Sequence, residues 1–206
     1  GTITGSQADV NSVYSVASSE FTGLGNEAVT VSGTMTAAQQ KTLDGQTSGV
    51  ITASISENTM TALADIADAN GNNALTITVT DSSVASAALN TLDGKTSVKI
   101  TATGVGTLTG TAADIATAIS ASTIDTKGDV ATTLDSGSVT AANLITINSN
   151  TSAKVGAANV GTITGSQADV NSVYSVASSE FTGLGNEAVT VSGTMTAAQQ
   201  KTLDGQ

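Results

Sequence analysis

The chain has 206 residues, of which 39% are hydrophobic but only 2% aromatic, and its formal net charge at pH 7 is −11. It contains no cysteine and no histidine, which excludes a disulfide framework and a histidine base. The negative charge makes nucleic acid and anionic lipid unfavourable partners, and without an apolar run of 18 or more residues no transmembrane segment is predicted.

The chain repeats itself. Residues 1–46 recur letter for letter as residues 161–206, an offset of 160. Shorter, diverged copies lie between them, such as AAQQKTLDGQTS at 37–48, SAALNTLDGKTS at 86–97 and AANLITINSNTS at 141–152. Residues 1–160 are therefore interpreted as one period of six coils, each of about 27 residues, and residues 161–206 as the start of the next, identical period.

Each coil begins with a stretch in which apolar and polar residues alternate, a pattern that indicates a half-buried strand. In chain order these stretches are VTVS (29–32), VITASI (50–55), LTITVT (75–80), VKITAT (98–103), DVATTL (129–134) and VGAAN (155–159). A second short strand is expected at 34–36, 59–61, 84–86, 107–109, 138–140 and 162–164. An Ala-rich segment follows each second strand, often after a Thr or Ser that would cap a short helix.

These elements predict a repetitive β-solenoid. One coil cannot bury its apolar face alone, but stacked coils can, because each covers the next. We expect a right-handed solenoid of parallel strands, stacked rung on rung, with two short strands plus a short helix or turn per coil. Residues 1–206 would form one continuous domain. The inward side chains would include Val29, Val31, Ile51, Ile55, Leu75, Ile77, Val79, Val98 and Ile100, and from the second strands Met35, Met60, Leu108, Val139 and Ile163.

Segments such as TLDGKTS (91–97) and TGTAADIATAIS (109–120) resemble the tandem repeats of very large secreted surface proteins of cyanobacteria and other aquatic bacteria. The resemblance covers nearly the whole chain, although its motifs are low in complexity. It implies an extracellular or cell-surface location and an adhesin-like or filament role. It assigns no catalytic residue.

No enzyme is predicted, because the sequence offers neither arginine nor histidine at an acidic cluster and almost no aromatic side chains to hold a sugar. No cofactor is expected. One weak calcium candidate consists of Asp68, Asn70 and Asn72, which alternate as at the start of an EF-hand loop. The glycine and the twelfth residue of that loop do not fit, so an Asn-Gly turn is the favoured interpretation.

A second pattern sets a threonine on each side of an apolar residue. If the apolar residue points inward, the threonines point outward and would form a regular array on stacked strands, with rungs about 4.8 Å apart. Such an array would suit an ice-binding or adhesin solenoid, although threonine is also an ordinary exposed strand residue. The candidates are Thr34, Thr36, Thr59, Thr61, Thr107, Thr109, Thr162 and Thr164.

The first expectation for function is an extracellular structural repeat protein that forms a filament, fibre or surface stalk by continuous stacking of rungs. Its partners would be other copies of itself, end to end or laterally, and cell-surface polysaccharide. The alternative is the ice-binding or adhesin solenoid that presents the threonine array. Thermal hysteresis would separate ice binding from the structural roles.

Overall fold

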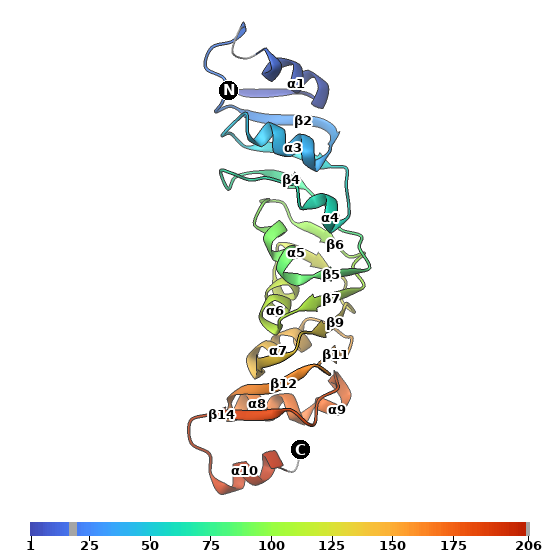
Figure 1. Ribbon diagram of the computed structural model, residues 1–206, viewed down its shortest axis with the longest axis vertical. Coiled ribbons are helices and arrows are strands. Elements are labelled where there is room, and N and C mark those ends of the chain that lie inside the picture. Colours follow the sequence, from blue (N-terminus) through green and yellow to red (C-terminus); the bar gives the residue numbers. More distant parts are fainter. Residues whose placement is uncertain (17–19, 205–206) are drawn as a thin grey trace. The chain divides into compact units, whose positions relative to one another are not determined.

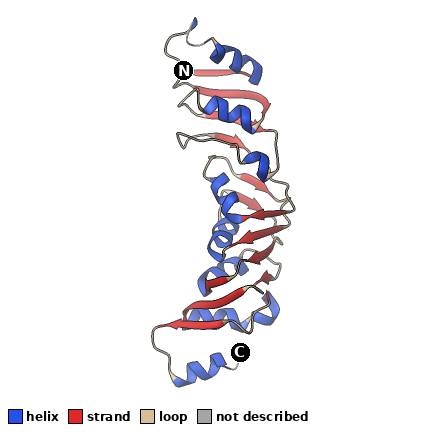
Figure 2. Cartoon of the chain, in the orientation of Figure 1, coloured by secondary structure: helices blue, strands red, loops and turns tan. Residues whose placement is uncertain are grey.

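The computed structural model describes residues 1–16 and 20–204, and it has an α/β fold. Short helices alternate along the chain with strands that join into four small sheets (Figures 1 and 2). The chain divides into two compact units. Unit 1 holds residues 1–81, 91–104 and 122–125, and unit 2 holds residues 82–90, 105–121 and 126–206.

Unit 1 contains a four-stranded parallel sheet in the order β1-β2-β3-β4. Its strands are β1 (Thr2–Ser6), β2 (Ala28–Met35), β3 (Ile51–Ile55) and β4 (Ala74–Thr76). Its helices are α1 (Gln7–Ser15), α3 (Ala37–Asp44) and α4 (Met60–Leu63). A separate two-stranded sheet pairs β6 (Ile100–Ala102) with β8 (Ile124–Thr126).

Unit 2 contains two parallel sheets. The first has the order β10-β12-β14 and consists of β10 (Gly137–Thr140), β12 (Val160–Ser166) and β14 (Ala188–Ser192). The second has the order β13-β11-β9-β7-β5 and consists of β5 (Ser83–Ala85), β7 (Thr107–Gly110), β9 (Ala131–Leu134), β11 (Val155–Gly156) and β13 (Phe181–Thr182). The helices are α6 (Ala112–Ser120), α7 (Ala141–Ser149), α8 (Gln167–Ser175), α9 (Ala177–Glu180) and α10 (Ala197–Asp204), while α5 (Ser86–Asp93) has residues in both units.

Several helices begin where a Ser or Thr hydroxyl accepts a hydrogen bond from an amide of the first turn. Thr36 caps α3 in this way and forms a capping box with Gln39. Equivalent caps start α1, α6, α7 and α8, at Ser6, Thr111, Thr140 and Ser166. A cap of this kind stabilises a helix by about 1 kcal/mol, and the Ala-rich sequence that follows has high helix propensity.

The cores consist of the apolar residues that alternate along the strands. Of the expected inward side chains on the first strands, all are buried except Val98, which is half-buried. Met35, Leu108, Val139 and Ile163 are also buried. Met60 is only half-buried, and it begins helix α4 instead of occupying a strand. The amide of Met60 donates to the Asp81 carboxylate at 2.8 Å, which favours the helix start there.

The prediction of a β-solenoid is wrong. The strands do not form continuous stacked sheets but divide among four small ones, the shortest strands having two residues. The pairing of β2 with β3 shifts register between Thr30 and Thr34. The pairing of β10 with β12 shifts register between Gly137 and Ser138. Helices of eight or nine residues, several of them capped by Ser or Thr, alternate with many of the strands, so the chain is an α/β protein.

Candidate functional site

The structure does not bring the eight predicted threonines together in one array. Thr34 lies on β2, Thr107 and Thr109 on β7, and Thr162 and Thr164 on β12, which belong to three different sheets. The other three lie at or in helices. Thr36 caps α3, Thr59 is the N-cap residue of α4 and Thr61 lies within α4.

Several of these hydroxyls already have partners within the protein. The Thr109 hydroxyl donates to the Val84 carbonyl at 3.4 Å, and the Thr164 hydroxyl donates to the Val139 carbonyl at 3.2 Å. Threonines do stand side by side elsewhere, because the pairing registers align Thr4, Thr30 and Thr52 in unit 1 and Thr140, Thr164 and Thr190 in unit 2. Binding of ice by the predicted residues stays a prediction.

The calcium candidates form a turn. The Asp68 carboxylate accepts hydrogen bonds from the amides of Asn72 and Asn73 at 3.1 and 3.4 Å. Gly71 has a φ of 67°, a left-handed conformation that glycine adopts at little cost. The side chain of Asn72 donates to the Ser48 carbonyl at 3.1 Å. Within residues 1–16 and 20–204 no cluster of three or more His, Cys, Asp or Glu could hold a metal ion.

The repeated segment keeps the same strand register and the same bounds of two helices in both places, although β2 runs on to Met35 whereas β14 ends at Ser192. Strand β1 pairs with β2 from Thr2↔Ala28 to Ser6↔Ser32, and β12 pairs with β14 from Thr162↔Ala188 to Ser166↔Ser192. Each residue number in the pairing of β12 with β14 is 160 higher than the corresponding number in the pairing of β1 with β2. Helices α1 and α8 also coincide in sequence and bounds, as do α3 and α10. The local conformation is therefore encoded within the segment itself.

The two copies differ in what covers them. In the first copy, strand β3 extends the sheet beyond β2, and Val29 pairs with Ile51. The Val29 amide donates to the Val50 carbonyl at 2.8 Å, and the Ser56 amide donates to the Met35 carbonyl at 2.9 Å. Val29, Val31, Met35 and Leu43 are consequently buried. We call this surface the downstream face of the segment; it consists of residues 27–44 in the first copy and 187–204 in the second.

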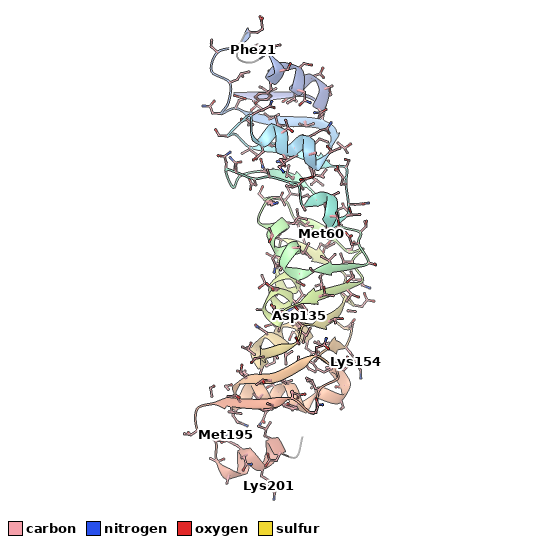
Figure 3. All side chains as sticks on the ribbon, in the orientation of Figure 1. Phe21, Met60, Asp135, Lys154, Met195 and Lys201 are labelled. Atoms are coloured by element: carbon pink, nitrogen blue, oxygen red, sulfur yellow. The ribbon has the colours of Figure 1, made fainter. Side chains whose placement is uncertain are left out.

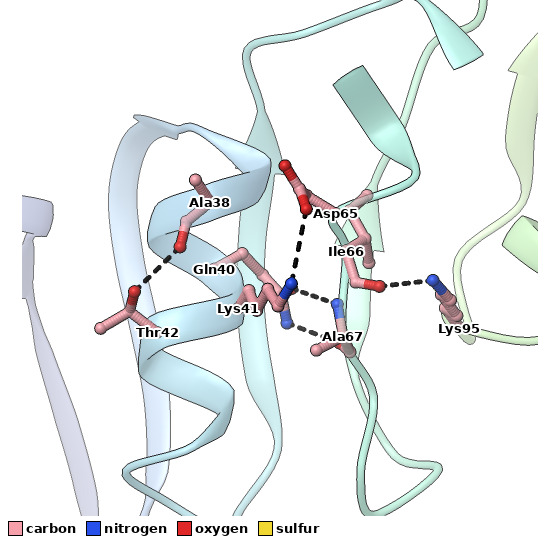
Figure 4. Close-up of polar contacts among 8 residues, drawn as sticks. All are labelled: Ala38, Gln40, Lys41, Thr42, Asp65, Ile66, Ala67 and Lys95. Atoms are coloured by element: carbon pink, nitrogen blue, oxygen red, sulfur yellow. Dashed lines mark hydrogen bonds and ion pairs between the residues drawn. The ribbon is translucent and has the colours of Figure 1, made fainter. Parts of the chain in front are cut away.

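Side chains add a second set of contacts to the downstream face of the first copy. The Gln40 amide group bonds both backbone groups of Ala67, donating to its carbonyl at 2.9 Å and accepting from its amide at 3.0 Å (Figure 4). The Asp44 carboxylate accepts from the Asn73 side chain at 2.8 Å and from the Ala69 amide at 3.0 Å. Gln40 is fully buried and Asp44 nearly so.

The downstream face of the second copy is uncovered. Val189, Val191, Met195 and Leu203 are half-exposed there. The Gln200 amide donates instead to the Asp204 carboxylate at 2.6 Å. A cavity of about 430 Å³ opens beside β14 and α10 and is lined by Tyr174, Gly185, Glu187, Val189, Val191, Met195, Gln200, Leu203 and Asp204. Eight of the nine equivalent residues in the first copy are buried. Figure 3 labels Met195 and Lys201 on this part of unit 2.

On the opposite side of the segment, which we call the upstream side, the second copy is the more deeply buried of the two. In the second copy Phe181 lies in β13, which pairs with β11, and only 4% of its surface is exposed. Its counterpart Phe21 is 48% exposed (Figure 3). Ile163, paired with Val139, is fully buried, whereas Ile3 is half-buried. The segment thus has two apolar faces, and each copy shows one of them covered by the chain beside it.

A tyrosine–glutamate pair lies next to the downstream face in both copies. The Tyr14 hydroxyl donates to the Glu27 carboxylate, which also accepts from the Gly25 amide at 2.7 Å and the Asn26 amide at 3.1 Å. Burial and the hydrogen bond to Glu27 raise the pKa of Tyr14 to about 12. Burial by itself would raise the pKa of Glu27, but the hydrogen bonds from Tyr14 and from these amides outweigh it and lower that pKa. The directions are the same for Tyr174 and Glu187.

A recurrent threonine hydroxyl donates to a backbone carbonyl 20 or 21 residues earlier in the chain, a contact that the sequence patterns did not predict. The Thr47 hydroxyl donates to the Glu27 carbonyl at 2.7 Å and accepts from the Gly49 amide at 3.0 Å. Thr96 and Thr151 make the corresponding contacts with Leu75 and Val130. The signal was present, because all three stand before a serine, three residues after Asp44, Asp93 or Asn148.

Comparisons with protein-family models, with curated proteins and with solved structures found no match. Among the residues that the structure describes, no helix has the length and apolar character that would be needed to span a membrane. The structural evidence for function therefore lies in the two faces of the repeated segment.

Proposed function

We propose that the chain is a structural repeat segment of an extracellular filament, fibre or surface stalk. The observation that carries the proposal is the repeated segment, which pairs its two strands in the same register in two places. In each place it buries an apolar face against the neighbouring part of the same chain. A unit that packs against its own neighbours can be added many times without a new kind of interface.

The chemistry of the interfaces supports a structural role. Parallel strand pairing, buried valine, isoleucine and leucine side chains, and threonine hydroxyls bonded to backbone carbonyls hold successive segments together. Contacts of this type require no ligand or metal. The net charge of −11 favours separation of neighbouring molecules in water, and the resemblance to secreted surface repeats supports the extracellular location.

The test is to lengthen the protein by whole periods. Chains with one, two and three copies of residues 1–160, each followed by residues 161–206, would be compared by small-angle X-ray scattering. We expect the maximum dimension to rise by an equal increment with every added period. If added periods form a compact particle instead, the radius of gyration grows with about the 0.38 power of chain length, and the stalk proposal fails.

The location has its own test. Antibodies raised against the folded chain would be applied to intact and to permeabilised cells of the source organism. Labelling of intact cells at the level seen after permeabilisation is the expected result. Labelling that requires permeabilisation would contradict the extracellular role.

A further inference from the structure

The turn that begins at Asp68 exposes the one Asn-Gly pair of the sequence, Asn70 and Gly71. The Asp68 carboxylate accepts from the amides of Asn72 and Asn73 and so holds the end of the turn. Among the residues that the structure describes, the Gly71 amide and the Asn70 side chain have no hydrogen-bond partner. The turn therefore leaves the Gly71 nitrogen free next to the Asn70 side chain, while it fixes the two amides that follow.

The surroundings of the pair do not hinder an approach of these two groups. Both residues are exposed. Apart from atoms of its chain neighbours, a Cβ atom at Gly71 would meet no heavy atom within 4 Å, and glycine has no side chain of its own to shield its nitrogen. Asparagine is one of the thermolabile residues, because the amide nitrogen that follows it can attack the side-chain carbonyl carbon.

We propose that Asn70 is a site of spontaneous deamidation, and that the modification loosens the packing of unit 1. The Gly71 nitrogen forms a bond to Cγ of Asn70. The bond between Cγ and Nδ2 breaks, and ammonia leaves with the proton of the Gly71 amide, so that a succinimide ring remains. Water then adds to one of the ring carbonyl groups and opens the ring. The product is aspartate, or isoaspartate, whose main chain runs through the side-chain carbon atoms. No oxidant, reductant or enzyme takes part, and the inference does not depend on the extracellular role.

The turn connects this site to a buried asparagine. Only 1% of the surface of Asn73 is exposed. Its side chain donates to the Asp44 carboxylate at 2.8 Å and accepts from the Ile51 amide at 3.1 Å. Its backbone carbonyl accepts from the Ser97 amide at 2.8 Å. Asn73 thus joins helix α3, strand β3 and the segment that follows α5.

Isoaspartate at position 70 disturbs this junction because its main chain is longer by one carbon atom. The added length displaces the amides of Asn72 and Asn73 from the Asp68 carboxylate, and it moves the Asn73 side chain away from its buried partners. A buried polar group that loses its partner is costly. The contacts of Asn73 with Asp44 and Ile51 should therefore open more often in the isoaspartate form.

Two other pairs in the chain are protected from the same reaction. Asn148 precedes a small residue, Ser149, but both lie in helix α7. In an α-helix each amide donates to the carbonyl four residues earlier, so the Ser149 nitrogen is not free to attack. Asp44 precedes Gly45 and could form the same ring with loss of water, but the Gly45 amide donates to the Lys41 carbonyl at 3.3 Å.

The test follows deamidation in the full chain, incubated folded and, in parallel, unfolded in urea. Mass spectrometry of digested samples locates each modified residue and separates aspartate from isoaspartate by fragmentation. We expect folding to change the rate at Asn70 by less than about threefold and to slow Asn148 by more than about tenfold. The rate at Asn70 should rise with pH, because the Gly71 nitrogen attacks after it has lost its proton. If folding slows Asn70 as strongly as Asn148, the proposal is wrong.

The loosening of unit 1 has a separate readout. Anion exchange isolates the deamidated chains, which carry one more negative charge. Hydrogen exchange in peptides that cover β3 should be about tenfold faster in their isoaspartate fraction than in the fresh chain. Asn70→Asp carries the charge without the longer main chain and should exchange within about twofold of the fresh chain. Asn70→Gln, incubated for the same time, should keep its mass and its exchange rates. Equal exchange in the deamidated and fresh chains would show that the modification is not coupled to the packing.

Discussion

At the scale of single residues, the repeated segment provides pairs of identical side chains in different surroundings. Gln40 is fully buried and bonds two backbone groups, while Gln200 is exposed and bonds a carboxylate. The same change at both positions therefore separates the effect of the environment from the effect of residue type.

Gln40→Ala should destabilise unit 1, whereas Gln200→Ala should not destabilise unit 2. The first change leaves the amide and carbonyl of Ala67 without their partner, and each buried unsatisfied group costs about 1–3 kcal/mol. The second removes an exposed contact and should change the free energy of unfolding by less than about 0.5 kcal/mol. Urea denaturation of both variants measures the difference, and equal losses would contradict the assigned contacts.

The tyrosine–glutamate pair predicts how stability depends on pH. The folded-state pKa of Tyr14 lies near 12, above its ordinary value of about 10, so its contribution is complete below about pH 10 and is lost as pH rises toward 12. The pKa of Glu27 is lowered, so its contribution is complete above about pH 4.5 and is lost as pH falls below it.

Tyr14→Phe should therefore reduce the alkaline loss of stability, measured as the urea midpoint between pH 9 and 12. Tyr174→Phe should act in the same direction in the second copy, because burial and the hydrogen bond to Glu187 raise the pKa of Tyr174 as well. An unchanged alkaline slope in both variants would contradict the pairing.

At the scale of elements, the sequence allowed more to be predicted about single strands and caps than about sheets. Alternation located β2, β3 and β9 because burial of every second side chain is a local signal. The Thr or Ser expected to cap the Ala-rich segments is also a local signal, and Thr36 and Thr111 are such caps, although Thr36 was also expected in the threonine array on a strand. The division into four sheets depends on register shifts and on strand partners more than 20 residues away, which local patterns do not encode.

The stretch at 75–80 illustrates the limit. Its alternation predicts six strand residues, but β4 ends at Thr76, and beyond it only Thr78 forms an isolated bridge with Thr101. Leu75, Ile77 and Val79 are nevertheless buried, as predicted. The pattern specifies which side chains face the core, whereas backbone pairing depends on the neighbouring strand. The downstream face could not be predicted either, because its exposure differs between copies of one sequence.

Gly49 allows the chain following the first copy to approach β2 closely. A Cβ atom at this position would overlap the backbone carbonyl of Glu27, so Gly49→Ala must displace one of the two segments. We expect a loss of about 1–3 kcal/mol in the free energy of unfolding. Gly128→Ala is the control, because its Cβ would meet nothing within 4 Å and its φ is not positive. Similar losses for the two variants, measured by thermal denaturation, would contradict the close approach.

At the scale of the whole molecule, the two copies of the segment differ in protection although they share one sequence and one strand register. Residues 27–44 are covered in unit 1, and residues 187–204 are uncovered in unit 2. Opening of a helix or strand costs less free energy where fewer buried contacts hold it. Stability is therefore expected to vary along the chain even where the sequence does not.

Hydrogen exchange monitored by mass spectrometry should reveal this difference directly. Peptides from residues 28–44 and 188–204 have the same sequence and mass, so they are detected together. We expect two isotope envelopes of equal area, of which the faster comes from the second copy. Deletion of residues 161–206 should remove the faster envelope. A single envelope at every exchange time would show that the covering segment gives no protection.

The parallel pairing also has a directional consequence. In the three larger sheets every strand runs the same way as its neighbours, and the repeated segment meets different partners on its two sides. Any assembly built from such segments is polar, with two chemically distinct ends. Subunits would join and leave the two ends at different rates.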